Sequence, residues 1–480
     1  MVISEVHGQP ARNVPELSRQ RRLGVLLICS MSLLIVGLDV TIVNVALPSI
    51  GRDLGASVSG LQWAVDAYTL VLASLLMTAG AMADRFGRRR VFLIGLGVFT
   101  ASSLLCSIAP NLGALVAFRM IQGVGASMLS PVALSIVTNT FTDARERAQA
   151  IGVWAAVFGI STALGPVVGG ALVSGLGWRS IFWINLPVGL TAVLLTLRFV
   201  PESRAPQARR PDVPGQLLVV TLLAALTFGI IEAPRRGWSA PLIVGAFVLA
   251  AAALVGLLRW ERRRFEPLLD LRFFHSVPFA GAAVIAIAAF ATLGGFLFLN
   301  TLYLQQVRGL SPVRAGLDIL PMAAMAMILP PLSGRIVGRH GARVPLVIAG
   351  IGLTTGCAML TQVNATTSFG YLFSAYAVFG LGFGFVNAPI TNAAVSGMPR
   401  AQAGVAGAIT ASSRQVGQTL GVAVVGALVA ASTGAAGWWV LVGCGFTVFI
   451  LGIVVTSARA QASAVRTAHQ LNPEFLVGAR

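Results

Sequence analysis

The chain has 480 residues, of which 56% are hydrophobic and only 10% are charged, and its formal net charge is +18. A soluble protein would carry about 25% charged residues, so the composition excludes an ordinary soluble domain. The net charge does not indicate a nucleic-acid partner. All 34 basic residues are arginines, almost all in short segments between apolar runs, whereas nucleic-acid-binding proteins carry basic stripes or tails.

Apolar runs of about 20 residues recur from Leu23 to Thr456, and each is long enough to cross about 30 Å of hydrocarbon. These runs mostly lack the polar stripe of a soluble amphipathic helix. The chain is therefore predicted to be an all-α integral membrane protein with fourteen transmembrane helices. They are expected at 23–47, 61–83, 91–109, 112–138, 148–173, 180–200, 214–233, 240–258, 278–303, 315–337, 345–363, 369–397, 404–430 and 437–457.

The distribution of arginines predicts the orientation. With a cytoplasmic N-terminus, 26 arginines fall in the tails and inner loops, six fall in outer loops, and Arg119 and Arg414 lie within helices. Cytoplasmic loops carry the excess of positive charge in membrane proteins. We therefore expect a multi-pass protein of the bacterial cytoplasmic (inner) membrane with both termini in the cytoplasm. The arginines before the first run suit a retained signal anchor.

A glycine–arginine pattern after the second predicted helix recurs after the tenth. The two copies, at 80–90 and 334–343, align at a constant offset of 254 residues. Two parallel repeats with a binding site between them form a transporter architecture. The predicted organisation is a cytoplasmic N-terminal tail (1–22), a six-helix bundle (23–200), a linker with two extra transmembrane helices (201–277), a second six-helix bundle related to the first by a pseudo-two-fold repeat (278–457) and a flexible cytoplasmic C-terminal tail (458–480).

Five segments carry a resemblance to a known family. The loop GAMADRFGRRR at 80–90 resembles the signature between helices two and three of the major facilitator superfamily. Four further segments resemble its fourteen-helix drug:proton antiporter branch, namely LDVTIVNVALP at 38–48, RMIQGVG at 119–125, GISTALGPVVGG at 159–170 and PLLDL at 267–271. The resemblance covers about 23–457. It implies alternating access by rocking of two six-helix bundles, with efflux driven by proton entry.

Two acidic residues and one arginine are candidates for proton coupling. Asp39 lies about two-thirds along the first predicted helix, where a carboxylate is costly unless it is paired, hydrated or protonated. Arg119 is its candidate partner, since the family places helices one and four together. Asp66, at a position where the family more often has a neutral residue, is either a second coupling group or an interfacial acid wetted from outside. Structural roles for Asp39 and Arg119 are the alternative.

The loop at 80–90 contains the candidate conformational gate. The resemblance assigns this role to Gly80, Asp84, Arg85, Gly87 and Arg88. Charged side chains of this kind form charge-assisted hydrogen bonds and cap helix ends. The alternative is that the arginines only anchor the loop on the cytoplasmic side.

The fifth predicted helix contains the motif that the family associates with antiporters rather than importers, formed by Gly159, Gly165, Pro166, Gly169 and Gly170. It extends a stripe of small residues that starts near Gly152. Such stripes let membrane helices approach closely, and a proline inside a helix bends it. We expect a tight, bent contact that closes one side of the transporter and suppresses leak. Ordinary helix packing is the alternative.

Four polar residues within predicted helices are candidates for lining a cavity. Gln122 lies one turn from Arg119, and Gln418 lies one turn from Arg414, so each arginine has an amide on its own helix face. Asn44 in the first helix completes this set.

The sequence contains no Walker motif, no His-x-x-x-His pair and no cysteine pair. We therefore expect no metal, no cofactor and no enzymatic activity, with the proton gradient as the energy source. The leading hypothesis is a monomeric, proton-coupled efflux transporter that exports small lipophilic compounds or antibiotics across the lipid bilayer. The alternatives are an exporter of an endogenous metabolite or lipid, a proton-coupled importer, or a membrane-embedded transferase.

Overall fold

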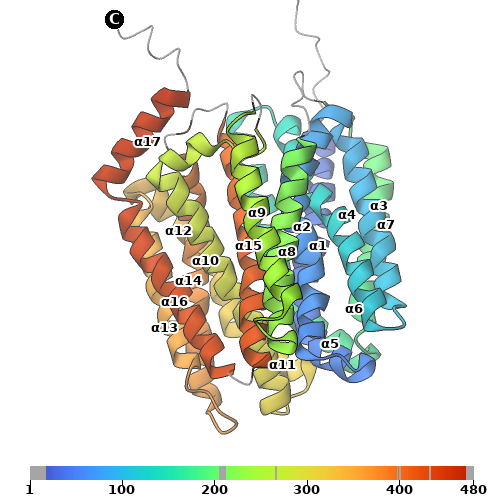
Figure 1. Cartoon of the computed structure of the whole chain (residues 1–480). Helices are drawn as coiled ribbons and strands as arrows, with labels where there is room; N and C mark the ends of the chain where they lie inside the picture. Colours follow the sequence, from blue (N-terminus) through green and yellow to red (C-terminus); the bar gives the residue numbers. More distant parts are fainter. Residues whose placement is uncertain are drawn as a thin grey trace, which may run out of the picture.

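The computed structural model describes residues 18–204, 212–264, 267–396, 398, 402–431 and 434–471, and this part of the chain is helical with no strand. Figure 1 shows one bundle of helices that run side by side. The long helices are α1 (Arg19–Leu54), α2 (Val58–Phe86), α3 (Arg88–Ser107), α4 (Leu112–Thr140), α5 (Ala144–Leu176), α7 (Asn185–Phe199), α8 (Val213–Arg236), α9 (Pro241–Glu261), α10 (Val277–Leu302), α12 (Leu320–His340), α13 (Arg343–Leu360), α14 (Phe369–Val395), α15 (Ala403–Ala430) and α16 (Gly434–Val454).

Thirteen helices among the described residues are long and apolar enough to cross a membrane. The short α6 (Ser180–Trp183) continues into α7 in this count. α15 is a further helix of 28 residues, made more polar by Arg414, Gln415 and Gln418, and it packs inside the bundle against α10 and α2. Together these helices agree with the fourteen predicted ones.

Local sequence signals set the helix ends. Ser57 and Asn111 accept hydrogen bonds from the backbone N–H groups three residues on, at the starts of α2 and α4. Asp143 accepts from the backbone N–H groups two and three residues on, at the start of α5. These side chains satisfy N–H groups that have no partner within the helix. Gly55 ends α1 in the left-handed conformation, which glycine adopts without strain.

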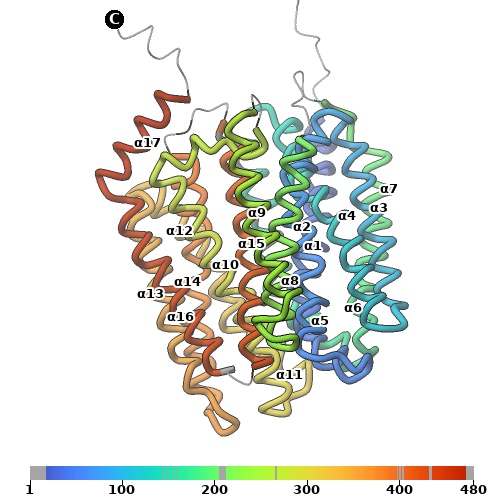
Figure 2. Tube along the Cα trace, in the orientation of Figure 1, coloured from blue at the N-terminus to red at the C-terminus, as the bar shows by residue number. Residues whose placement is uncertain are grey.

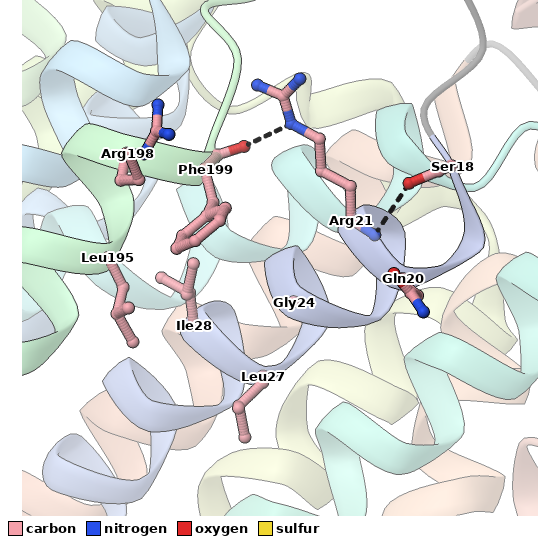
Figure 3. A pocket seen from close by; sticks show the side chains of 9 residues that line it. All are labelled: Ser18, Gln20, Arg21, Gly24, Leu27, Ile28, Leu195, Arg198 and Phe199. Carbon is pink, nitrogen blue, oxygen red and sulfur yellow. Dashed lines mark hydrogen bonds between the residues drawn. The ribbon is translucent and has the colours of Figure 1, made fainter.

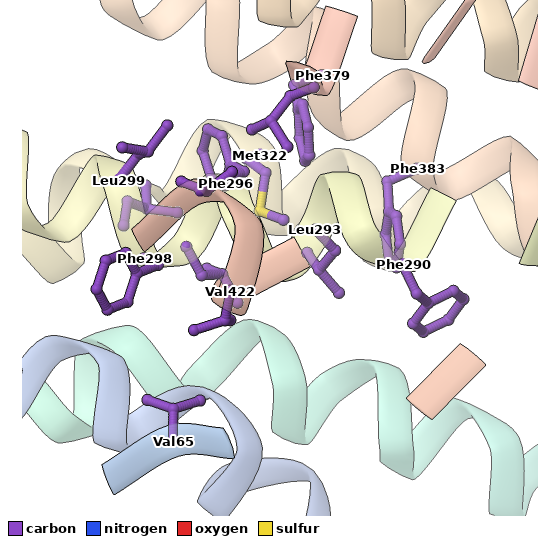
Figure 4. Close-up of a cluster of buried hydrophobic side chains, with 14 of the residues drawn as sticks. Val65, Phe290, Leu293, Phe296, Phe298, Leu299, Met322, Phe379, Phe383 and Val422 are labelled. Carbon is purple, nitrogen blue, oxygen red and sulfur yellow. The ribbon is translucent and has the colours of Figure 1, made fainter. Parts of the chain in front are cut away.

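The helices form two groups, with α1–α7 in one half and α10–α16 in the other, as the colours of Figure 2 show. The second half contains an aromatic cluster in which the rings of Phe296 and Phe379 stack at 4.3 Å. Figure 4 shows Val65 of α2 facing this cluster across the boundary between the halves. One continuous apolar core therefore joins the two halves.

The inserted helices α8 and α9 pack on each other, and α8 also contacts α2 and α15. Gln216 of α8 donates a hydrogen bond to the carbonyl of Ser74 on α2 at 2.6 Å. Near the other end of α8, Glu232 accepts one from the indole of Trp63 at 3.2 Å. The inserted pair thus lies along the contact between α2 and α15, the most extensive contact between the halves.

We call the end of the bundle where α1 begins the terminal end, and we call the opposite end the distal end. The last helix, α17 (Ala458–Leu471), also lies at the terminal end (Figure 1). The prediction that the C-terminal tail is flexible is wrong for residues 458–471, because they form the helix α17. The helix α17 buries small residues such as Ala460 and Ala464 four positions apart, and Ser463 accepts a hydrogen bond from the Val277 backbone. Residues 472–480 lie outside the described part.

The tenth membrane helix also differs from the prediction of 315–337. A separate short helix, α11 (Pro312–Asp318), precedes it at the distal end, and α12 begins at Leu320. The α10 helix ends in one turn of π-helix, η2 (Tyr303–Val307). A single turn of 3-10 helix, η1 (Leu271–His275), leads into α10 at the terminal end.

Candidate functional site

A buried ion pair lies inside the first half. The Nη1 atom of Arg119 on α4 is 2.5 Å from Oδ2 of Asp39 on α1, and both side chains are at most 2% exposed. Gln122, one turn from Arg119, accepts from the same Nη1 at 2.7 Å and donates to Oδ1 of Asp39 at 2.9 Å. The expected contact between Asp39 and Arg119 is therefore present, and Gln122 completes a closed three-residue hydrogen-bond ring.

Two further helices support this ring. Asn185 of α7 donates to Oδ1 of Asp39 at 3.4 Å and to the hydroxyl of Ser103 on α3 at 3.2 Å. Ser103 also accepts from Gln122 at 2.8 Å. Sequence reasoning missed Ser103 and Asn185, since a lone serine or asparagine in an apolar run gives no signal of its partners.

The second helix contributes to the same site through Arg119. The guanidinium donates from Nε to the carbonyl of Ala64 at 3.1 Å and lies 4.3 Å from the ring centre of Tyr68. A desolvated cation over an aromatic face is stabilised by about 2 kcal/mol or more. Arg119 therefore joins α1, α2 and α4.

The groups that form hydrogen bonds with the Asp39 carboxylate are all donors. Asp39 accepts from a cation and two amides, and an ionised carboxylate has only acceptor sites. The Asn185 Oδ1 atom is buried and makes none of the hydrogen bonds found in the described part of the chain. It is an available acceptor if Asp39 becomes protonated. Asp39 lies 20 residues from the start of α1, about 30 Å at ~1.5 Å per residue, which is closer to the distal end.

Asp66 lies apart from this ring. It is fully buried on α2, so it is not a wetted interfacial acid in this conformation. Its Oδ1 atom accepts from Thr69 at 3.4 Å, and the Thr69 hydroxyl lies 2.9 Å from that of Thr419 on α15. Within the described residues the Oδ2 atom has no partner. Asp66 thus lies at the α2–α15 contact rather than beside Asp39.

The candidate gate lies at the terminal end, where α2 turns into α3. Arg88 donates to Asp84 at 2.8 and 3.1 Å. Gly87 has φ +110°, and a Cβ there would lie 2.7 Å from the carboxylate carbon of Glu202. Arg85 is exposed, with its guanidinium 5.6 Å from the Phe86 ring.

Glu202 is a gate residue that the sequence did not reveal. Glu202 follows the end of α7 in the chain. Its carboxylate accepts hydrogen bonds from the backbone N–H groups of Arg89 at 3.1 Å and Arg90 at 3.3 Å, in the first turn of α3. An acidic side chain stabilises a helix at this end. A Cβ at Gly80 would meet no atom within 4 Å, so Gly80 makes no comparable contact.

The antiporter motif of α5 contacts both halves. A Cβ at Gly165 would lie 2.9 Å from the Thr41 Cβ, and one at Gly169 would lie 3.4 Å from the Ile42 Cα, both on α1. On the other side, a Cβ at Gly170 would lie 2.9 Å from the Val313 Cα on α11. Close packing thus holds α5 between the two halves at the distal end.

The same contact includes the backbone around Pro166, which a Cβ at Gly316 of α11 would meet. The earlier glycines of the predicted stripe make no close contact of this kind. A Cβ at Gly152 or Gly159 would meet nothing within 4 Å. The expected tight contact is therefore limited to residues 165–170.

Two glutamines also join the halves toward the distal end. Gln62 of α2 donates to the carbonyls of Ala423 at 2.8 Å and Val422 at 3.3 Å on α15. In the opposite direction, Gln305 of η2 donates to the carbonyl of Val45 on α1 at 2.8 Å. Together with the α5–α11 contact, they close the distal end in this conformation.

The other candidates for cavity lining are spread over the molecule. Arg414 donates to the Thr391 hydroxyl at 2.8 Å rather than to an amide of its own helix, and its guanidinium lies 5.8 Å from the Phe290 ring. Gln418 is buried against Gly294 of α10. Asn44 donates to the Val40 carbonyl at 3.1 Å in its own helix. Gln122 therefore belongs to the Asp39 ring, and the structure does not bring these three to it.

The fold and the buried site define a multi-pass membrane transporter built from two helical halves. The family model described as Major Facilitator Superfamily matches residues 29–422. This chain therefore belongs to the Major Facilitator Superfamily, whose members transport small molecules, and it is not an enzyme.

Similar proteins agree with this assignment. The multidrug resistance protein Stp of Mycobacterium tuberculosis is 40% identical over 409 residues, which cover 85% of this chain and 75% of that protein. The tetracenomycin C resistance and export protein of Streptomyces glaucescens is 37% identical over 436 residues, covering 90% and 81%. The crystal structure of a peptide transporter POT superposes with a TM-score of 0.69 at 14% identity, covering 92% of this chain and 95% of that one.

Proposed function

We propose that this protein is a proton-coupled efflux transporter that exports small lipophilic compounds, antibiotics among them, by alternating access of its two halves. The names of similar proteins support efflux as the direction, since they describe multidrug resistance and tetracenomycin C export. The observation that carries the proposal is the buried Asp39–Arg119 pair. A membrane-embedded carboxylate of this kind marks ion and proton pathways.

The coupling step follows from the hydrogen bonds of Asp39. In the ionised state its charge is balanced by Arg119, while Gln122 and Asn185 donate to its other oxygen. A proton that binds Asp39 cancels this charge and leaves Arg119 without a counter-ion inside the membrane. An unpaired buried charge is costly, so the helices that carry the two residues rearrange. We propose that this rearrangement opens one side and closes the other.

The α5–α11 contact is the second element of the mechanism. In this conformation it closes the distal end, which the arginine distribution assigns to the outside of the cell. Both termini are then cytoplasmic, in the cytoplasmic membrane of a bacterium. Proton binding from outside requires this contact to open, and the small residues at 165–170 let it close again without gaps.

Asp66 is proposed as a second protonatable group. Its buried carboxylate has one oxygen without a partner among the described residues, and it lies beside the Thr69–Thr419 contact between the halves. A charge on Asp66 is costly while α2 and α15 are in contact, because that contact keeps the carboxylate buried. Protonation of Asp66 would therefore favour the closed α2–α15 contact.

Transport into inside-out membrane vesicles tests the proposal. With an imposed proton gradient, vesicles that contain the protein should accumulate a lipophilic cationic dye, and a protonophore should abolish the accumulation. The proton gradient is then the energy source, with no cofactor. Uptake that persists with the protonophore would contradict proton coupling. No uptake across a panel of dyes would favour the alternative, an exporter of an endogenous metabolite or lipid.

A further inference from the structure

A cavity of about 550 Å³ lies at the terminal end between the first turns of α1 and the last turns of α7 (Figure 3). Its volume is in the range of small-molecule sites, about 300–1,000 Å³. It is separate from the Asp39 site. The lining residues are Ser18, Gln20, Arg21, Gly24, Leu27, Ile28, Leu195, Arg198 and Phe199.

The cavity has a polar end and an apolar wall. Arg21 and Arg198 lie where the apolar runs of α1 and α7 end, and arginines near the ends of membrane helices extend to the membrane surface. Toward the bilayer interior, Leu27 and Leu195 line the wall. Leu27 is 61% exposed, and a large exposed apolar side chain at this depth faces lipid. The cavity therefore opens to the bilayer.

The two arginines keep donors available. To the described residues, Arg21 donates from the Nε atom of its side chain alone; this bond, to the Phe199 carbonyl at 3.4 Å, fixes the side chain across the cavity. Arg198 makes none of the hydrogen bonds or ion pairs that the structure records for its described residues. The adjacent Arg22, by contrast, pairs with Glu146 at 2.7 Å. Within the part of the chain that the structure describes, two cations without a counter-ion thus share one cavity.

We propose that this cavity binds the headgroup of an anionic phospholipid. The guanidinium groups of Arg21 and Arg198 would hold the phosphate, since arginine donors match phosphate oxygens in a two-pronged geometry. The acyl chains would run along Leu27 into the bilayer. Basic pockets between membrane helices on the cytoplasmic side recognise anionic headgroups in this way. A soluble phosphate would leave the apolar wall without a partner.

Such a lipid would connect α1 to α7. These helices also meet at the buried site, where Asn185 of α7 donates to Asp39 of α1. Lipid binding at the terminal end therefore stabilises the relative position of two helices that support Asp39.

Native mass spectrometry of the purified, delipidated full-length protein tests this site. The probes are phosphatidylglycerol and phosphatidylcholine with identical acyl chains. We expect the first bound lipid to be phosphatidylglycerol. The double variant Arg21→Gln/Arg198→Gln should weaken its binding about tenfold or more, as expected for lost charged hydrogen bonds. Arg259→Gln is the matched control, because Arg259 is also exposed near the terminal end, on α9.

Three outcomes would overturn the proposal: equal retention of the two lipids, unchanged phosphatidylglycerol binding in the double variant, or displacement of the lipid by inorganic phosphate. If the double variant does not fold, Arg198→Gln alone decides the question, because that side chain makes no hydrogen bond or ion pair with another described residue. It should still lower phosphatidylglycerol binding severalfold relative to Arg259→Gln.

Discussion

Arg119 and Asp39 lie 80 positions apart in the chain, yet their side chains form an ion pair of 2.5 Å with at most 2% of either exposed. Because each is the other's counter-ion, neither charge is stable alone at this depth. A proton can therefore change the balance between helices by binding to one carboxylate.

Replacing Arg119 with alanine leaves Asp39 as an unpaired buried charge. We expect a loss of about 3–5 kcal/mol of stability and loss of proton-driven export. Thermal unfolding of the purified protein measures the first effect, and vesicle transport measures the second. The double variant Arg119→Ala/Asp39→Asn should regain part of the stability, because it removes the unpaired charge. Full proton-coupled export by Arg119→Ala would refute the coupling role of the pair.

Adding one methyl group at Gly165 should damage transport. The new Cβ would overlap the Thr41 side chain on α1, and overpacking costs about 1–3 kcal/mol. We expect Gly165→Ala to reduce the transport rate at least severalfold. Gly152→Ala, in the same helix but with no atom within 4 Å of the new Cβ, should transport at the wild-type rate. Equal rates for the two variants would contradict the role of the close contact.

The glutamines that join the halves should control the distal end. Gln62→Leu and Gln305→Leu each remove hydrogen bonds to the opposite half, so the distal end should open more often. Cysteines at Ser174 and Val313, which meet at the closed end where the Val313 backbone N–H donates to the Ser174 hydroxyl at 3.4 Å, should cross-link less in both variants than in the parent. Gln362→Leu changes an exposed glutamine near this end and should leave the yield unchanged. An unaltered yield in all three would show that the glutamines do not hold the end closed.

Gly87 should tolerate no side chain, because its φ is +110° and a Cβ would meet the Glu202 carboxylate. Left-handed backbone costs about 1–2 kcal/mol for other residues, and displacement of Glu202 would remove the cap on α3. We expect Gly87→Ala to lower the melting temperature by several degrees. Gly80→Ala, a few residues earlier and without close neighbours, should change it little. The reverse order of the two variants would contradict this account of the turn.

The sequence predicted what depends on local pattern. Apolar length and breakers placed most membrane helices within a few residues, although α1 continues to Leu54 and α12 begins only at Leu320. The charge inside the first helix marked Asp39. Its partner Arg119 followed from the cost of two isolated charges and from the family's arrangement of helices one and four.

The parts that the sequence could not predict depend on tertiary contacts. Glu202 meets the first turn of α3 only because α7 ends beside it. Ser103 and Asn185 are ordinary polar residues until the fold brings them to Asp39. The small-residue stripe of α5 continues to Gly152, but the backbone approaches α1 and α11 closely only from Gly165 on, since a Cβ at Gly152 or Gly159 would meet no atom within 4 Å.

The most direct test of the central claim compares wild type with Asp39→Asn in inside-out vesicles under an imposed proton gradient, with dye exchange measured in the absence of the gradient as a control for folding. Asparagine keeps the shape of the side chain but cannot carry the proton. We predict that Asp39→Asn still exchanges dye but no longer accumulates it. Gradient-driven accumulation by Asp39→Asn at the wild-type level would contradict the assignment of Asp39 as the proton-coupling residue.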